Sequence, residues 1–123
     1  MKQFYDKLVK TRYHLHQHPE LSGQEYETTA FLSRYLQDLG IKILDSGLET
    51  GLIAEIGQGE PVIALRADID ALPIIEQTGL PYASQNPGVM HACGHDFHQT
   101  SLLGAAELLK AMEEDLQGTI RLI

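Results

Sequence analysis

The sequence predicts an α/β fold, in which helices pack against a sheet. Apolar residues recur at three- and four-residue steps in the first third of the chain, which indicates helices. The pattern then changes to short β-branched runs separated by glycines, and a third helical run is followed by one more such run. With 123 residues, of which 43% are hydrophobic, the chain can fill one domain but hardly two.

Two helices are expected at the start of the chain. The apolar spacing over residues 4–16 predicts the first helix, and Pro19 ends it. Ser22 and Glu25 have the spacing of a capping box and predict the start of a second helix. Gly40 is expected to end that helix, because glycine readily adopts the left-handed conformation that often follows a helix.

Strands are expected in the middle of the chain, at residues 41–44, 52–56 and 61–66. We expect the last two of these strands to pair as a hairpin, since only a short glycine-bearing connection separates them. Residues 73–88 contain several glycine, proline and asparagine residues typical of turns, and they should form a loop at the surface.

The last part of the chain predicts a helix and a strand. Apolar residues over 97–112 mark a third helix, which we expect Gly118 to end. Residues 119–123 form a β-branched run that stops without a turn residue, so we expect the chain to be the front part of a larger protein. This strand is also expected to be an open sheet edge that invites association with another chain.

The composition argues against several classes of partner. Nine Lys and Arg residues against 17 Asp and Glu residues give a formal net charge of -8, so no basic field attracts nucleic acid. No apolar run approaches the roughly 20 residues of a membrane-spanning helix, and charges close to Met1 argue against a signal peptide. The single cysteine, Cys93, fits a reducing compartment, so we expect a cytoplasmic protein.

Two carboxylates follow the strand expected at residues 61–66. Asp68 and Asp70 would lie at the carboxyl end of that strand, where open α/β sheets bind ligands. If the segment is extended, both side chains point the same way and need a cation, which either Arg66 or a metal ion could supply. The carboxylates could bind the ion or orient its imidazole ligand, although aspartates also favour turns after strands.

The densest cluster of reactive side chains lies between Met90 and His98, with three histidines, one cysteine and one aspartate. Cys93 and His95 are the preferred metal ligands, because thiolate and imidazole suit zinc-like ions. Gly94 between them permits the sharp turn that would let both face one ion. The chain offers no second ligand pair at the spacing of a zinc finger, which disfavours a structural zinc site.

Each of the other polar residues in this cluster has two interpretations. Asp96 stands where the third helix is expected to begin, so we favour an N-cap role over metal binding. His98 is a candidate for substrate binding and equally a surface residue of the first helical turn. His91 is a candidate substrate contact, and a packed, hydrogen-bonded histidine is an equal alternative.

Two further patterns imitate functional sites. His14 and His18 have the four-residue spacing of a helical metal site, but Pro19 biases His18 away from helical geometry. The acidic run Glu113-Glu114-Asp115 looks like a tandem acid pair, but it falls at the end of a helix in a polar stretch. A solvated face is the expected role of this run.

Four groups of residues, spread along nearly the whole chain, carry a resemblance to a known family. They are Leu15-His16 with Pro19-Glu20-Leu21-Ser22 and Glu25; Arg66-Ala67-Asp68-Ile69-Asp70-Ala71-Leu72-Pro73; Met90-His91-Ala92-Cys93-Gly94-His95-Asp96 with His98; and Leu102-Leu103-Gly104-Ala105-Ala106. In these residues the sequence resembles the M20 metallopeptidases and amidohydrolases, in particular the subgroup with hippurate hydrolase, auxin-conjugate hydrolases and N-acetyldiaminopimelate deacetylase.

The resemblance implies a hydrolase of small N-acyl amino acids that uses two divalent ions, Mn²⁺, Zn²⁺, Co²⁺ or Ni²⁺. Cys93 and His95 match two of the metal ligands of the family. Asp68 and Asp70 match the stretch in which family members place an active-site aspartate that supports the metal site. In the implied mechanism the two ions polarise the amide carbonyl and activate a bridging water, while a carboxylate base moves the proton.

The resemblance also implies how the chain relates to a whole enzyme. Residues 1–123 would be the N-terminal part of a two- or three-layered, phosphorylase/hydrolase-like catalytic domain that binds the metals, with helices on a mixed sheet. They would stop before a Glu-Glu segment that follows the strand at 119–123, and the lid or dimerisation domain would be absent. We therefore expect the 123-residue chain to be inactive and to bind metal weakly, and the full-length protein to be a homo-oligomer.

Two other classes of function remain open at this point. Cys93 could act as a nucleophile, with His95 or His98 as its base. Alternatively, the chain could be a non-catalytic metal-binding module, which the missing glutamates permit if the protein ends at Ile123.

Overall fold

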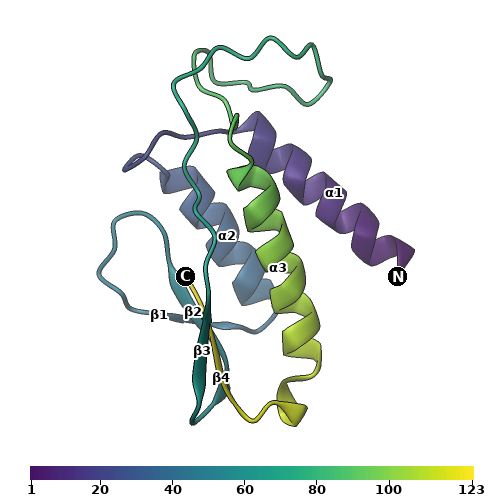
Figure 1. The fold of residues 1–123 in the computed structure, drawn as a ribbon, viewed down its shortest axis with the longest axis vertical. Helices are drawn as coiled ribbons and strands as arrows, with labels where there is room; N and C mark the ends of the chain where they lie inside the picture. The colour runs from purple at the N-terminus through teal and green to yellow at the C-terminus, as the bar shows by residue number, and fades with distance from the viewer.

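The computed structural model describes all 123 residues, which form three α-helices, one short 3-10 helix and four strands. Figure 1 shows their arrangement, with the helices running along the length of the molecule. In chain order the elements are α1 (Lys2–Gln17), α2 (Tyr26–Asp38), β1 (Lys42–Leu44), β2 (Ile53–Gln58), β3 (Val62–Leu65), α3 (His95–Ala111), η1 (Glu113–Asp115) and β4 (Gly118–Leu122).

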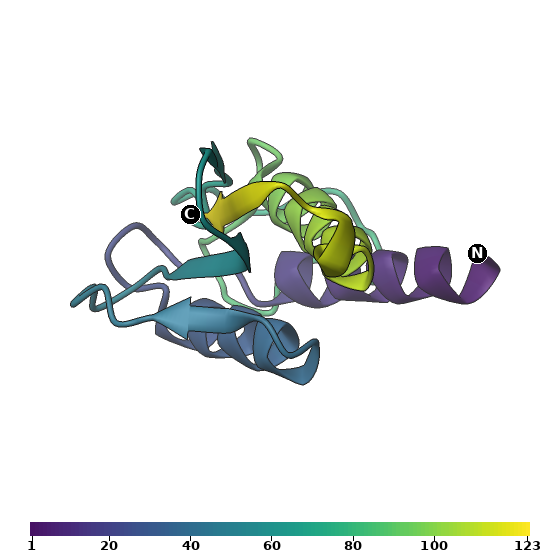
Figure 2. The same ribbon diagram turned by 90° about the horizontal axis from the view of Figure 1, so that it is seen from below.

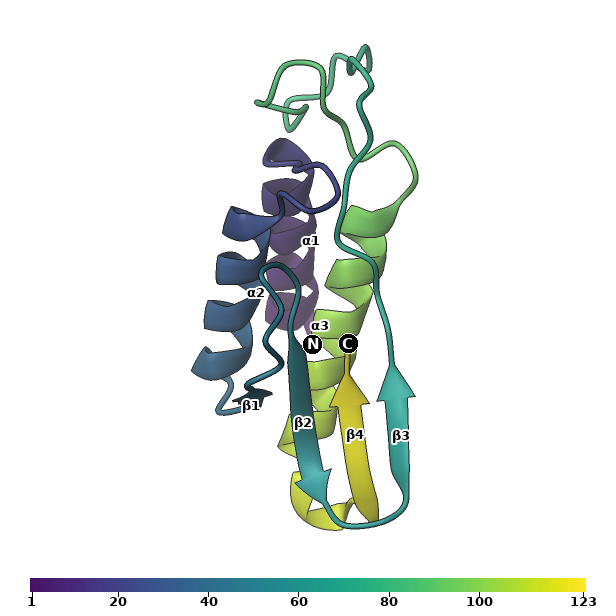
Figure 3. The same ribbon diagram turned by 90° about the vertical axis from the view of Figure 1, so that its left-hand side faces the viewer.

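The four strands form one mixed sheet in the order β1-β2-β4-β3. β4 pairs antiparallel with β2 and parallel with β3, so it lies between two strands that are neighbours in the chain (Figure 3). The predicted hairpin of β2 and β3 is therefore wrong, and so is the prediction that β4 is an open edge. The central position buries Leu122 of β4, and the edges of the sheet are instead β1 and β3.

Helices α2 and α3 cover one face of the sheet, and α1 packs against α3 on the same side of the molecule (Figure 2). A cluster of buried apolar side chains fills the space between the two layers. Its members are Leu32 and Leu36 of α2, Ile41, Ala54 and Ile56 of β2, Leu103 and Ala106 of α3, and Leu122 of β4. On the other face of the sheet, Arg121 donates to Glu55 at 2.6 Å. The α/β class with helices on a mixed sheet is confirmed.

The start of α2 differs from the predicted capping box. A turn closed by the Gln24 N–H and the Leu21 carbonyl delays the helix, which begins only at Tyr26. The Glu25 carboxylate accepts from the N–H of Gly23 instead of reaching Ser22. Glu20 caps the helix from outside, because its carboxylate accepts from the N–H groups of Glu27 and Thr28, at 3.2 and 2.6 Å.

The end of α2 follows the prediction. Gly40 has a positive φ of 75°, and its N–H donates to the carbonyl of Gln37. The N–H of Ile41 donates to the carbonyl of Leu36, which completes a Schellman motif.

Helix α3 packs closely against α1 at a glycine. A Cβ on Gly104 would lie 2.9 Å from a methyl carbon of Leu8, so a larger residue there would force the Leu8 side chain to shift. At its other end α3 stops at Ala111, before η1, and Gly118 begins β4 rather than ending the helix. The Glu113 carboxylate fixes this turn by accepting from the N–H of Gly57 at 2.9 Å. None of the helices is long and apolar enough to cross a membrane.

Candidate active site

The segment that follows β3 meets the start of α3 at one end of the molecule. In Figure 1 this region lies at the top of α3, beneath the long loop of residues 73–88. Gly94 precedes α3 with φ 103°, a left-handed backbone conformation that residues other than glycine rarely adopt. The sharp turn expected between Cys93 and His95 is therefore present.

Asp70 and His95 are in direct contact. Nδ1 of His95 lies 3.0 Å from Oδ1 of Asp70 and 3.0 Å from the main-chain carbonyl of Asp70. Both oxygens accept hydrogen bonds, so Nδ1 carries a proton and donates it to them. In the neutral ring this leaves the lone pair of Nε2 free, which is the tautomer that a metal-binding histidine held by a carboxylate adopts.

Cys93 and Asp68 are the more exposed members of the predicted site. The Cys93 thiol is free and solvent-exposed. Asp68 accepts from Arg66, with Oδ1 2.9 Å from Nε and 2.8 Å from Nη2. Arg66, one of the two cations predicted for the aspartate pair, thus pairs with Asp68. Asp70 contacts the imidazole of His95.

A cavity of about 540 Å³ lies between α2, α3 and the segment that follows β3, and neither Cys93 nor His95 is among the residues that line it. Asp68 and Asp70 both line it, together with Ala67 and Ile69 of the same segment. Its walls are mainly apolar, with Leu103 and Leu122 among the lining residues. A mostly apolar cavity with a few polar groups on one side is typical of small-molecule sites.

Asp96 has a different role from the predicted N-cap. The N-cap position belongs to Gly94, and the side chain of Asp96 is 1% exposed. Its Oδ2 lies 2.8 Å from Nδ1 of His16 and 3.0 Å from Nε of Arg12. Burying an ionised carboxylate is costly unless a partner compensates its charge. Both partners of Asp96, Arg12 and His16, come from α1.

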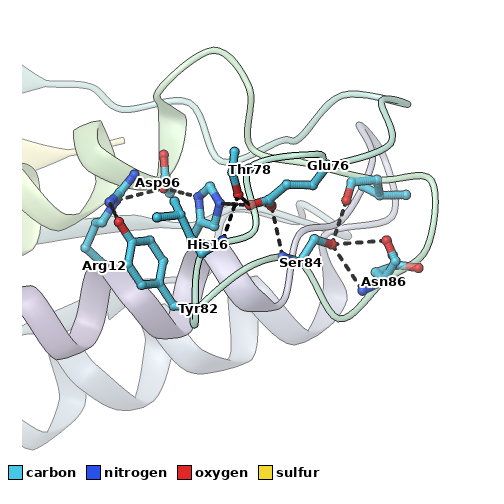
Figure 4. A network of polar contacts seen from close by, with 10 residues as sticks. Arg12, His16, Glu76, Thr78, Tyr82, Ser84, Asn86 and Asp96 are labelled. Carbon is cyan, nitrogen blue, oxygen red and sulfur yellow. Dashed lines mark hydrogen bonds and ion pairs between the residues drawn. The ribbon is translucent and has the colours of Figure 1, made fainter.

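A buried polar network therefore runs from α1 through α3 into the loop of residues 73–88 (Figure 4). Nε2 of His16 lies 3.0 Å from Oε1 of Glu76, which also accepts from the N–H of Ser84 at 2.9 Å. Oε2 of Glu76 accepts from the Thr78 hydroxyl. The loop of residues 73–88 is irregular, as predicted. The sequence predicts this loop at the surface, but the Glu76 carboxylate that it carries is buried. The helical spacing over residues 4–16 and the family resemblance included His16, but no local pattern pointed to Glu76.

His91 is packed, but it lacks the hydrogen bonds expected of a packed histidine. Its side chain is 5% exposed and neither ring nitrogen has a partner. Burial lowers the pKa of His91 to about 4, an effect that Asp96 opposes and His16 supports. The other buried atoms without partners are Oδ1 of Asp96 and Oε1 of Gln99, so all of them belong to residues 91–99.

The remaining candidates lie outside this network. His98 and Phe97 are exposed, so Phe97 does not join the core. The rings of His95 and His98 have centroids 6.0 Å apart. His18 lies beyond the end of α1, with Nδ1 2.7 Å from the His14 carbonyl.

The side chains of this region suit a metal ion only in part. Cys93 offers an accessible sulfur and His95 an unpaired Nε2, while Asp70 orients the imidazole; these donors suit zinc-like ions. No three histidine, cysteine, aspartate or glutamate side chains of the chain converge closely enough to hold a metal ion. The residues fit part of a metal site.

Comparisons with known proteins agree with this architecture. The sequence pattern of peptidase family M20/M25/M40 matches residues 64–123. An N-acetyl-L-cysteine deacetylase of Bacillus subtilis (strain 168) is 60% identical over 119 residues, which are 95% of this chain and 29% of that protein. The chain belongs to the M20 peptidase family. An N-acetylcysteine deacetylase of the same organism is 56% identical over 125 residues, covering 99% of this chain and 33% of that protein.

A solved structure shows the same fold. The crystal structure of a Bacillus subtilis protein, described as a dinuclear metal binding peptidase from the M20 family, superposes with a TM-score of 0.95 at 55% identity. The match covers 99% of this chain and 35% of that chain. This M20 chain therefore spans about a third of the length of the relatives it matches.

Proposed function

We propose that the protein carrying this chain hydrolyses the amide bond of N-acyl amino acids with the help of two divalent metal ions. We further propose that residues 1–123 form the N-terminal part of its catalytic domain. The observation that carries the proposal is the contact between Asp70 and His95, with the exposed Cys93 two residues before His95. The M20 relatives support amide hydrolysis, and two of them are named as deacetylases of N-acetylcysteine.

Each residue of the site has a distinct role in this proposal. Cys93 and His95 would hold metal, and bound divalent ions supply Lewis-acid chemistry that polarises a carbonyl and activates water. Asp70 keeps the proton on Nδ1 of His95, fixes the ring and raises the basicity of Nε2. Asp68, tied to Arg66 at the cavity, contributes negative charge near the site.

The proton acceptor and the remaining ligands are proposed to lie in a Glu-Glu segment and histidines that follow β4 in the full-length protein. The chain itself offers two donors, Cys93 and His95, whereas a stable dinuclear site needs about five or six, bridging ones included. The 123-residue chain alone should therefore show no amidase activity and bind Zn²⁺ or Mn²⁺ only weakly.

The test uses the full-length protein and the variants Cys93→Ser and His95→Gln, with His18→Gln as a matched histidine control. Metal content is measured by mass spectrometry, and hydrolysis by acetate release from N-acetylcysteine and other N-acetyl amino acids. We expect both site variants to lose metal and activity, and the control to keep both. A chelator should abolish turnover, and Mn²⁺ or Zn²⁺ should restore it.

The nucleophilic-cysteine alternative makes the opposite prediction. Turnover would survive the chelator but would be lost on alkylation of Cys93, and Cys93→Ser would remove activity without changing metal content. This alternative needs a contact between the Cys93 thiol and the ring of His95 or His98, and the structure shows no hydrogen bond between them.

A further inference from the structure

We propose that His16 is a positioning residue of the site, which fixes the first turn of α3 by donating to Asp96 and Glu76 from its two ring nitrogens. This inference rests on the proposed function, since it concerns how Cys93 and His95 are held in place. His16 lies on α1, far from these residues in the sequence, and it reaches α3 through Asp96.

The geometry leaves the ring little freedom. His16 is 3% exposed, and the carboxylates on either side of it, from Asp96 and Glu76, are 1% and 4% exposed. The ring bonds Asp96 at 2.8 Å through Nδ1 and Glu76 at 3.0 Å through Nε2 (Figure 4). The ring of Tyr82 meets it edge-on at a centroid distance of 5.6 Å.

The two hydrogen bonds of His16 require a proton on each of its ring nitrogens. An ionised carboxylate can only accept, so a histidine between two of them must donate from both nitrogens and carry a positive charge. Glu76 is ionised, because the hydrogen bonds from Thr78, Ser84 and His16 outweigh burial and hold its pKa below the usual range. Arg12, which is always charged, supplies the second cation next to Asp96.

The four charges balance in this arrangement. Arg12 and His16 are positive, and Asp96 and Glu76 are negative, so the buried group is neutral as a whole. His91 is the remaining titratable neighbour, and a charged His16 favours the neutral form of its ring. Removing the His16 charge would leave two buried carboxylates with one cation, which is strongly unfavourable.

The network acts on the site because Asp96 directly follows His95 in the first turn of α3. The hydrogen bond from Nδ1 of His16 to Asp96 links this turn to α1. The bond from Nε2 to Glu76 links it further to the loop of residues 73–88. Catalytic and metal-binding side chains work only when held within about half an ångström, so a loose first turn would misplace both proposed ligands.

The test compares His16→Gln with Glu107→Gln in the full-length protein. Glu107 also ties α3 to α1, through Lys7 at 2.8 Å, but it does so further along the helix. Zn²⁺ and Co²⁺ affinity is measured by titration, and the visible spectrum of the Co²⁺ protein reports the geometry around the ion. We expect His16→Gln to lower metal affinity about 10- to 100-fold and to alter the spectrum. Glu107→Gln should reduce stability alone.

Two further measurements keep the proposal testable if metal binding fails. In the metal-free protein, hydrogen exchange of the amides of residues 95–98 should accelerate in His16→Gln but not in Glu107→Gln. The double variant His16→Gln with Glu76→Gln should lose less free energy of unfolding than the two single variants lose in sum, because it also removes the uncompensated carboxylate.

The outcomes separate the two proposals. If Cys93→Ser binds metal as tightly as the unchanged protein, the proposed function fails, while faster exchange in His16→Gln still supports positioning. If a folded His16→Gln protein keeps the exchange rates, the Co²⁺ spectrum and the metal affinity of the unchanged protein, the positioning role is overturned. Should His16→Gln not fold, Arg12→Lys and Glu76→Gln test the same network with milder changes.

Discussion

At the scale of single residues, the most unusual feature is the set of buried polar atoms without partners around the first turn of α3. Both nitrogens of His91, Oδ1 of Asp96 and Oε1 of Gln99 have none. Native proteins satisfy nearly all buried polar groups, and exceptions often mark functional positions. Their proximity to the contact between Asp70 and His95 supports the assignment of this region as the site.

The two aspartates of the predicted pair should differ in effect. We expect Asp70→Asn to weaken metal binding by the full-length protein about 10- to 100-fold, because an amide orients His95 without the charge that raises its basicity. Asp68→Asn should have a much smaller effect, since Asp68 is half-exposed and paired with Arg66. Calorimetric titration with Zn²⁺ measures both, and equal losses would contradict the assignment.

Glu76 predicts a pH dependence of stability. Its pKa is lowered in the folded state from 4.5, so its contribution is complete above that value and is lost as the pH falls through the folded pKa. Glu76→Gln should therefore destabilise the protein by about 1–3 kcal/mol at neutral pH. The difference should shrink in acid. Urea unfolding at several pH values measures it; a constant difference would show that the carboxylate charge is not responsible.

At the scale of elements, some helix ends are fixed by contacts between neighbouring residues and others by contacts with distant segments of the chain. The Schellman motif at Gly40 involves only neighbouring residues, whereas the cap of α2 comes from Glu20, in the preceding connection. Helices α1 and α3 approach closely at Gly104. The first turn of α3 depends on residues of two other segments, through His16 and Glu76.

The cap of α2 can be tested directly. Glu20→Ala should destabilise the protein by about 1–2 kcal/mol, because the N–H groups of Glu27 and Thr28 lose their acceptor. Ser22→Ala should change stability much less, since α2 begins only at Tyr26. Thermal unfolding of the two variants gives the comparison, and a larger loss for Ser22→Ala would restore the capping box.

At the scale of the whole molecule, the position of β4 decides which surfaces are exposed. β4 is paired on both sides, so its backbone groups are satisfied within the sheet. The exposed edge that carries large apolar side chains is β3, where Ile63 is 55% exposed. Unpaired strand edges of this kind promote association between chains.

This position predicts which substitution reduces self-association of the 123-residue chain. Ile63→Lys should lower it, because a charged side chain on an edge strand opposes pairing with another chain. Ile123→Lys serves as the control, since Ile123 is also exposed but lies beyond the central strand. Analytical ultracentrifugation measures the association. If only Ile123→Lys reduced it, the strand order would not explain the association.

Much of the fold and part of the site followed from local patterns. Helices and strands follow from the spacing of apolar residues, which is a property of a few turns of chain, and the sharp turn at Gly94 follows from one glycine. The residue pattern and the family resemblance both singled out Cys93, His95 and the aspartate pair, and the contact between Asp70 and His95 brings two of these residues together. Their roles as metal-site residues stay predictions.

Only the tertiary structure decided the strand order and the partners of the buried charges. β4 pairs between β2 and β3 because that position buries its apolar side chains against α2 and α3, and no local signal distinguishes it from an edge position. His16, Glu76 and Asp96 come from α1, a loop and α3, and each is an ordinary polar residue within its own segment. Their common position was invisible in the sequence because buried charges select partners by the space they share, not by their separation along the chain.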